Sequence, residues 1–265
     1  MGTPDLIAFA GAVAAGDIEV IDLTHTLTPE FPTIVMPPEL GQCAPFRMEE
    51  VSRYDERGPA WYWNNISMGE HTGTHFDAPV HWISGKDLPN GSVDTIPAEN
   101  FIAPAVVVDI SAQSAANPDY ELTVADVTAW EERHGRIPPR SWVLLRTDWS
   151  KRGGRDYVNM REDGQHTPGP CPEVVRFLVE ERDLHGFGTE TIGTDAATGA
   201  GDDRCMGRGI VVVHARRSAD GNAPRGTRAS TRSGLPDPRR IFSGAARITE
   251  PVGGSRSRLA RHCRP

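Results

Sequence analysis

The sequence has few cysteines and no long apolar run. Its four cysteines, Cys43, Cys171, Cys205 and Cys263, form no CxxC pair, which argues against a disulfide framework or a structural zinc site, so we expect free thiols. No stretch of eighteen apolar residues occurs, and we therefore predict no transmembrane helix. The apolar residues 6–15 lack the basic lead-in of a signal peptide, and the expected location is the cytoplasm.

Lysine is absent from the last quarter of the chain. Residues 201–265 contain fourteen Arg, no Lys and five acidic residues, a net charge of +9, whereas residues 1–200 carry −17, which together give −8. The acidic majority disfavours nucleic acid as a partner. We expect residues 1–200 to form the main domain and residues 201–265 to be an anomalous Arg-rich part of it. Residues 215–240 have the composition of a disordered basic arm, or of a GC-rich gene read out of frame.

The order of expected elements predicts an α/β fold. The chain is long enough to bury a sizeable core, and its 38% hydrophobic and 24% charged residues are typical of a soluble globular protein. One helix shows a capping-box pattern at Thr123 and Asp126, and another begins with Pro172. Helices are expected at 4–15, 123–136 and 172–184. Strands are expected at 19–23, 46–53, 60–68, 101–110, 141–147, 188–195, 210–213 and within 239–248, with a long loop at 24–42.

Three histidines and an aspartate lie within eleven residues. The stretch reads His71-Thr72-Gly73-Thr74-His75-Phe76-Asp77-Ala78-Pro79-Val80-His81. Imidazole nitrogens and a carboxylate oxygen suit Zn, Mn or Fe(II). The interleaved Thr, Gly and Pro argue against a helix. In an extended segment His75, Asp77 and His81 would share one face, and a bend at Gly73 would bring His71 to them. The alternative is a chance cluster of surface histidines.

This stretch matches a family signature. Every defined position of His71-x-Gly73-Thr74-His75-x-Asp77-x-Pro79-x-His81 fits HxGTHxDxPxH, so the chain resembles the metal-dependent cyclase family, which includes bacterial kynurenine formamidase and isatin hydrolase. The resemblance spans about residues 18–196, and its flanking stretches look most like isatin hydrolase: 61–64, 81–87, 146–149, 166–170 and 192–196. It implies a barrel-like core of mixed β-strands with flanking helices, of the swivelling β/α type.

The resemblance also implies a site and a reaction. His71, His75 and Asp77 would bind one divalent ion, Mn²⁺ or Zn²⁺, and His81 would act as the acid/base. Metal-activated water would open a cyclic aryl amide, as in the conversion of isatin to isatinate. Alternatives are hydrolysis of an N-formyl amide, as in kynurenine formamidase, and a catalytically impaired metal-binding protein. The family suggests a homodimer.

Other candidate residues have weaker support. Trp61 and Trp63 would line an aromatic substrate pocket or pack in the core. His166 would reach the substrate from a loop or stabilise that loop. Asp203 and His214 occupy the region where kynurenine formamidases bind a second metal, although we expect a single metal here. His25 either supports the site or lies on the surface.

Overall fold

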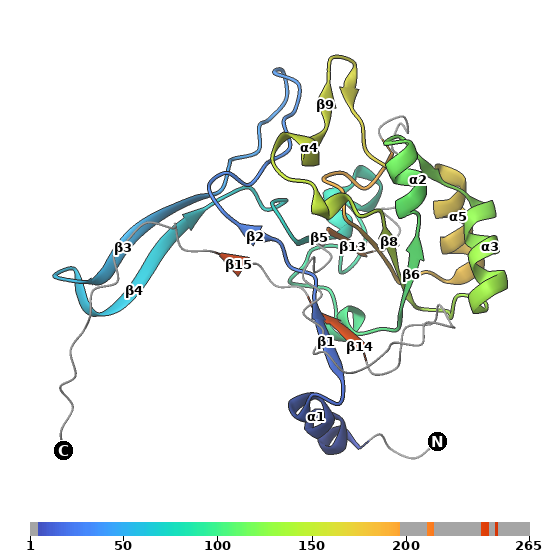
Figure 1. Ribbon diagram of the computed structural model, residues 1–265, viewed down its shortest axis with the longest axis horizontal. Coiled ribbons are helices and arrows are strands. Elements are labelled where there is room, and N and C mark those ends of the chain that lie inside the picture. Colours follow the sequence, from blue (N-terminus) through green and yellow to red (C-terminus); the bar gives the residue numbers. More distant parts are fainter. Residues whose placement is uncertain (1–4, 197–210, 215–239, 244–246, 249–265) are drawn as a thin grey trace.

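The structure is a computed structural model that describes residues 5–196, 211–214, 240–243 and 247–248. A mixed five-stranded sheet forms its centre, in the order β5-β13-β12-β8-β6 (Figure 1). Its strands are β5 (His75–Asp77), β13 (Val211–His214), β12 (Gly186–Thr189), β8 (Trp142–Arg146) and β6 (Ala105–Asp109). The last four run parallel, whereas β5 is antiparallel to β13. The predicted α/β class is confirmed.

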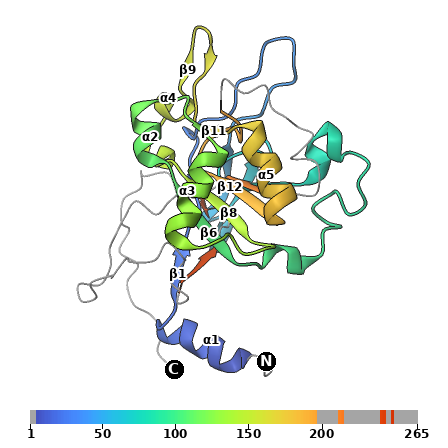
Figure 2. The same ribbon diagram turned by 90° about the vertical axis from the view of Figure 1, so that its right-hand side faces the viewer.

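Two helices cover one face of this sheet. Helix α3 (Val124–His134) and helix α5 (Pro172–Arg182) lie side by side in front of the strands in Figure 2. Their buried side chains form one core with those of β6, β8 and β12: Val106, Val108, Val143, Leu145 and Phe187 from the strands, and Val127, Trp130, Val174 and Leu178 from the helices. Burial alternates along β6 and β8: every second residue is fully buried, and the residues between them are mostly half-buried.

Local sequence signals explain where these helices begin. The Thr123 hydroxyl accepts a hydrogen bond from the Asp126 backbone N–H (3.3 Å), and the Asp126 carboxylate accepts one from the Thr123 backbone N–H (2.9 Å). This is the predicted capping box, which satisfies two N–H groups that a helix N-terminus leaves open. Helix α5 begins with Pro172, whose missing N–H costs nothing at that position.

The N-terminal segment is joined to strands near the C-terminus. Helix α1 (Leu6–Ala15) is followed by β1 (Glu19–Asp22) and β2 (Thr26–Leu27). Strand β1 pairs in parallel with β14 (Arg240–Ser243), and β2 with β15 (Arg247–Ile248). Helix α1 has no buried residue and projects from the body (Figure 1).

A long hairpin projects on another side. Strands β3 (Arg47–Asp55) and β4 (Gly58–Ser67) form a two-stranded antiparallel sheet (Figure 1). Shorter elements complete the described chain: α2 (Ser111–Ala116), β7 (Glu121–Leu122), α4 (Arg155–Val158), β9 (Met160–Arg161), β10 (Gly164–Gln165) and β11 (Gly169–Pro170).

The predicted strand at 188–195 is mostly wrong. Strand β12 ends at Thr189, and the buried Glu190 then turns toward β8. Its carboxylate accepts hydrogen bonds from the backbone N–H and the hydroxyl of Ser150, at 3.1 and 2.8 Å. These hydrogen bonds satisfy a buried carboxyl group at the point where the chain leaves the sheet. The loop at 24–42 likewise contains the short strand β2.

Several expectations concern the C-terminal part. Strands β13, β14 and β15 pair with strands from residues 1–200, while the division at residue 200 stays a prediction. The expected basic arm or out-of-frame stretch at 215–239 lies outside the described residues. Cys43 and Cys171 are free, and the other two cysteines lie outside the described ranges. No helix in the described part of the chain is long and apolar enough to cross a membrane.

Candidate metal centre

The motif folds as a bend, a short strand and a helical turn. Gly73 has φ +68°, which turns the chain sharply. Strand β5 then extends from His75 to Asp77, and Pro79–His81 forms a 3₁₀ turn. The predicted bend at Gly73 is confirmed. His81 differs from the prediction, because the 3₁₀ turn, and not a continuous extended face, brings it back toward Asp77.

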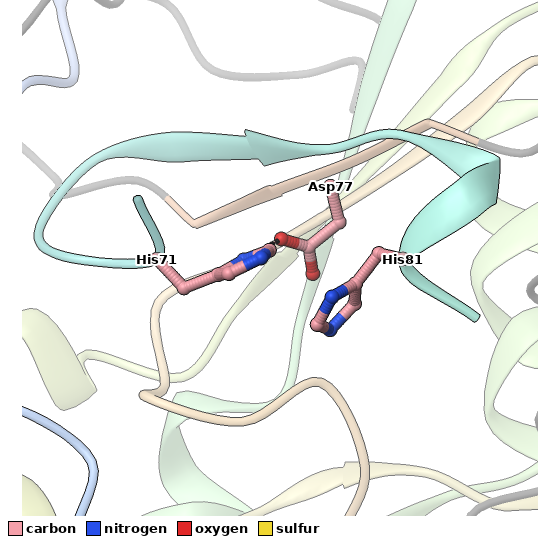
Figure 3. Close-up of side chains that lie close together, drawn as sticks. All are labelled: His71, Asp77 and His81. Carbon is pink, nitrogen blue, oxygen red and sulfur yellow. Dashed lines mark hydrogen bonds and ion pairs between the residues drawn. The ribbon is translucent and has the colours of Figure 1, made fainter. Parts of the chain in front are cut away.

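All four predicted side chains meet at this loop. The carboxylate oxygen Oδ1 of Asp77 lies 2.6 Å from His71 Nδ1 and 3.1 Å from His75 Nε2. Ligand atoms of His71, Asp77 and His81 all lie within 4.8 Å of one another (Figure 3). Asp77 is buried and His81 is exposed. The cluster is therefore open to solvent on the His81 side.

The donor set fits a divalent cation. His75 Nδ1 lies 2.8 Å from the carbonyl of Gly73, to which it must donate a proton because a carbonyl only accepts. In the neutral ring Nε2 then carries a lone pair, which faces the Asp77 carboxylate oxygen at 3.1 Å. Two acceptors that face each other repel, and either a proton on Nε2 or a bound cation removes that repulsion. Ligands about 2.0–2.2 Å from one metal lie about 3 Å apart, as these atoms do.

The environment of the cluster shifts two pKa values in opposite directions. The hydrogen bond to the Asp77 carboxylate raises the pKa of His71. Partial burial, followed by the proximity of His71, lowers the pKa of His81. The ring centroids of His71 and His81 are 4.0 Å apart. Both effects favour the neutral imidazole of His81, which is the form that can accept a proton.

A tryptophan beside His81 was missed in the sequence. The Trp82 ring meets the His81 ring edge to face, with centroids 4.7 Å apart, and Trp82 also packs against Val175 of α5. Its position in the sequence, directly after His81, could have indicated that it contacts the site. Trp82 therefore links the orientation of His81 to the helical layer.

The structure does not bring Trp61 and Trp63 to the cluster. Both lie on β4, within the hairpin, and are 52% and 55% exposed. They are not packed in the core. Within one chain, the substrate-binding role predicted for them has no support.

His214 lies close to the motif in the sheet. The register of β13 and β5 pairs it with His75. Asp203 lies outside the described residues. A second metal bound by these two residues stays a prediction.

His166 lies between two carboxylates. Its Nδ1 is 2.8 Å from Asp119 Oδ2, and its Nε2 is 2.9 Å from Oδ1 of Asp163, which lies in the turn between β9 and β10. Both ring nitrogens are engaged in these ion pairs. Its predicted role in substrate binding stays a prediction, and the observed contacts stabilise the hairpin.

The His166 ion pairs predict a pH dependence of stability. Hydrogen bonds to Asp119 and then Asp163 raise the pKa of His166 above its ordinary value. The charged ring therefore stabilises the fold below about pH 6.5, and this contribution is lost as the pH rises through the higher pKa of the folded state. Replacing His166 with Asn should make the melting temperature less dependent on pH above neutrality. An unchanged dependence in this variant would contradict the assignment.

Gly73 should tolerate no side chain. A Cβ at this position would lie 2.5 Å from Leu27 Cδ2, and the positive φ is itself unfavourable for alanine. We expect Gly73→Ala to lower the free energy of unfolding by about 1–3 kcal/mol. Gly16→Ala is the matched control, because Gly16 also has a positive φ, +80°, in the left-handed helical region, but a Cβ there has nothing within 4 Å. Urea denaturation should show a larger loss for Gly73→Ala, and an equal loss would exclude a role for the Leu27 contact.

Comparisons with known proteins found similar sequences and structures. The family model described as "Putative cyclase" matches residues 21–196. Isatin hydrolase from Roseibium aggregatum is 42% identical over 199 residues, which cover 74% of this chain and 75% of that protein.

The solved structures that are similar to this chain also include isatin hydrolases. Isatin hydrolase A from Labrenzia aggregata, bound to benzyl benzoate, has 58% identity and a TM-score of 0.78 over 81% of this chain and 87% of that one. An isatin hydrolase bound to the product analogue thioisatinate has 37% identity and a TM-score of 0.77, with the same two coverages.

Proposed function

The chain belongs to the cyclase family, and from that membership we propose that it is a metal-dependent hydrolase that opens the ring amide of isatin or a similar cyclic aryl amide. The observation that carries the proposal is the convergence of His71 Nδ1 and His75 Nε2 on one oxygen of the buried Asp77, with His81 beside them. The isatin hydrolases among its relatives support the substrate class.

We propose that His71, His75 and Asp77 hold one Mn²⁺ or Zn²⁺ ion. Two imidazoles and a carboxylate suit either ion. Three protein ligands leave a coordination position open for water or substrate. When bound, the ion supplies Lewis acidity that activates water and polarises the amide carbonyl.

A backbone hydrogen bond fixes the orientation of the His75 ring. Its Nδ1–H is fixed by the carbonyl of Gly73, which leaves Nε2 directed at Asp77. Metal-ligating histidines commonly donate their other N–H to a carbonyl or carboxylate in this way.

We propose that His81 transfers the proton. Within the described residues its ring makes contacts with the rings of His71 and Trp82, and no hydrogen bond fixes it as one fixes His75. It is exposed, and its lowered pKa favours the neutral form. Such an imidazole accepts a proton from water and returns it to the leaving amide nitrogen, which cannot leave as an anion.

The test is substrate turnover by the metal-loaded protein. The full chain, loaded with Mn²⁺ or Zn²⁺, is incubated with isatin, and ring opening is followed by absorbance. N-formylkynurenine is the comparison substrate. We expect isatin to be hydrolysed faster. Hydrolysis of N-formylkynurenine alone would favour a formamidase, and metal binding without turnover of either compound would favour an impaired homologue.

We also propose that the chain forms a homodimer. Helix α1 contains no charged residue and exposes Leu6 and Ile7 at 73% and 85%, while the hairpin exposes Trp61 and Trp63. A second copy would remove these surfaces from water. In this proposal the two tryptophans of one copy line the substrate site of the other.

The dimer predicts the effect of one charge on α1. Ile7→Lys should shift the chain from dimer to monomer in sedimentation velocity, because burying an unpaired lysine opposes association. Val35→Lys is the control, since Val35 is also exposed, at 64%, but lies outside α1 and the hairpin. A wild-type chain that sediments as a monomer at all concentrations would refute the proposal.

A further inference from the structure

The metal-binding loop is attached to the segment that follows β1. The hydroxyl of Thr74, which directly precedes His75, donates a hydrogen bond to the carbonyl of Leu23 at 3.2 Å. The same oxygen accepts a hydrogen bond from the backbone N–H of His25 at 2.7 Å. His25 Nδ1 lies 3.1 Å from it. The contacts join residues 49 to 51 positions apart in the chain.

The hydrogen-bond roles can be assigned from the chemistry of a hydroxyl. A threonine hydroxyl has one proton and two lone pairs. Its proton is directed to the Leu23 carbonyl, so both approaching nitrogens must be donors. His25 therefore carries its proton on Nδ1. The Thr74 oxygen is fully used, and its position is fixed from three directions.

His25 is buried between aromatic rings. His25 is 5% exposed, and its ring meets Phe31 and Tyr157 edge to face, with centroids 5.4 and 5.7 Å away. Gly73, the residue before Thr74, also lies against this segment, because a Cβ at Gly73 would collide with Leu27 Cδ2. The loop thus lies against the segment 23–27 at two successive residues.

We infer that His25 is a positioning residue for the metal ligands, acting through Thr74. The inference rests on the proposed function, since it assumes that His75 and Asp77 bind the metal. Thr74 lies between Gly73, whose carbonyl fixes the His75 ring, and His75 itself. If Thr74 moves, the Gly73 carbonyl and the His75 backbone move with it, and Nε2 loses its direction toward Asp77.

The test measures metal affinity and not only turnover. Isothermal titration calorimetry with Mn²⁺ and with Zn²⁺ gives the dissociation constant for each full-length variant. Residues that support metal ligands typically change affinity 10–100-fold. We expect Thr74→Val to weaken binding by about that range and His25→Leu by about 10-fold. The double variant should be no weaker than Thr74→Val alone, because both changes remove the same contact.

Two variants of His25 separate positioning from packing. The amide nitrogen of Asn is attached at Cγ, as Nδ1 is in His, whereas that of Gln lies one atom further out. His25→Asn should therefore recover most of the metal affinity, and His25→Gln should not. Phe31→Leu is the packing control. It removes a ring contact to His25 but no hydrogen bond to Thr74, so it should lower the melting temperature and leave metal affinity unchanged.

The outcomes are distinguishable. If the wild-type chain binds neither ion, the proposed function fails and not merely the role of His25. If wild type binds metal and His25→Leu binds it equally well while folded, His25 is not a positioning residue. Equal losses in His25→Leu and Phe31→Leu would assign the effect to packing and overturn the inference. Should His25→Leu fail to fold, the comparison of His25→Asn with His25→Gln decides in its place.

Discussion

Asp77→Asn is expected to abolish metal binding and with it turnover. The Asp77 oxygen Oδ1 is the point at which His71 Nδ1 and His75 Nε2 meet, at 2.6 and 3.1 Å. Asparagine keeps the shape but removes the negative charge. Since residues that only support a ligand change affinity 10–100-fold, loss of a ligand should weaken metal binding by at least about 100-fold. The lost Lewis acidity corresponds to several kcal/mol, or about 10³-fold in rate.

Thermal unfolding with and without metal measures this loss directly. A ligand at 100 times its dissociation constant stabilises the folded state by about 2.7 kcal/mol, so the wild-type melting temperature should rise with added Mn²⁺ or Zn²⁺. Asp77→Asn should show no rise. Asp109→Asn is the matched control, because Asp109 ends β6 of the same sheet and pairs with Arg146, away from the cluster. A normal metal-induced shift in Asp77→Asn would exclude Asp77 as a ligand.

The start of a helix and the bend in the motif could be predicted because residues close to them in the sequence determine them. The capping box at Thr123 and Asp126 fixes the start of α3 whatever lies around it. The bend at Gly73 follows from a residue that accepts positive φ. The meeting of His71, His75 and Asp77 follows from that bend and from the alternation of β5. The motif therefore determined most of the candidate site.

Long-range pairings were not predictable from such signals. Strand β1 pairs with β14, more than two hundred residues along the chain, and β2 pairs with β15. Short strands carry too little pattern to specify a partner. The same limit applies to His25, whose contact with Thr74 is made across the fold. It also applies to Glu190, which follows β12 and accepts a hydrogen bond from Ser150, forty residues earlier in the chain.

The hairpin shows why residue type alone did not predict where two candidate residues lie. Trp61 and Trp63 suit both a core and a ligand pocket. In the structure β3 and β4 pair only with each other among the described strands, so the hairpin leaves the body and carries both rings into solvent. An isolated two-stranded hairpin is at best marginally stable in water. That observation favours a second copy as the surface on which it lies.

His81→Ala is expected to separate catalysis from metal binding. His81 is exposed, and no hydrogen bond to a described residue fixes its ring in the way that Gly73 fixes His75. If it carries the proton, its removal should lower kcat for isatin by about 10²–10⁴-fold, the usual contribution of a general acid or base. The dissociation constant for Mn²⁺ or Zn²⁺ should stay near that of wild type, because His71, His75 and Asp77 remain.

Loss of metal binding in His81→Ala would instead identify His81 as a metal ligand. Its ligand atom lies within 4.8 Å of those of His71 and Asp77, so coordination is the alternative role. In that case His81→Ala would lose metal affinity together with turnover, as Asp77→Asn does. Trp82→Phe is the companion variant. It keeps an aromatic ring against His81 and Val175, so it should retain both metal affinity and most of the turnover. Calorimetry and initial rates on the same preparations therefore decide whether His81 moves the proton or holds the ion.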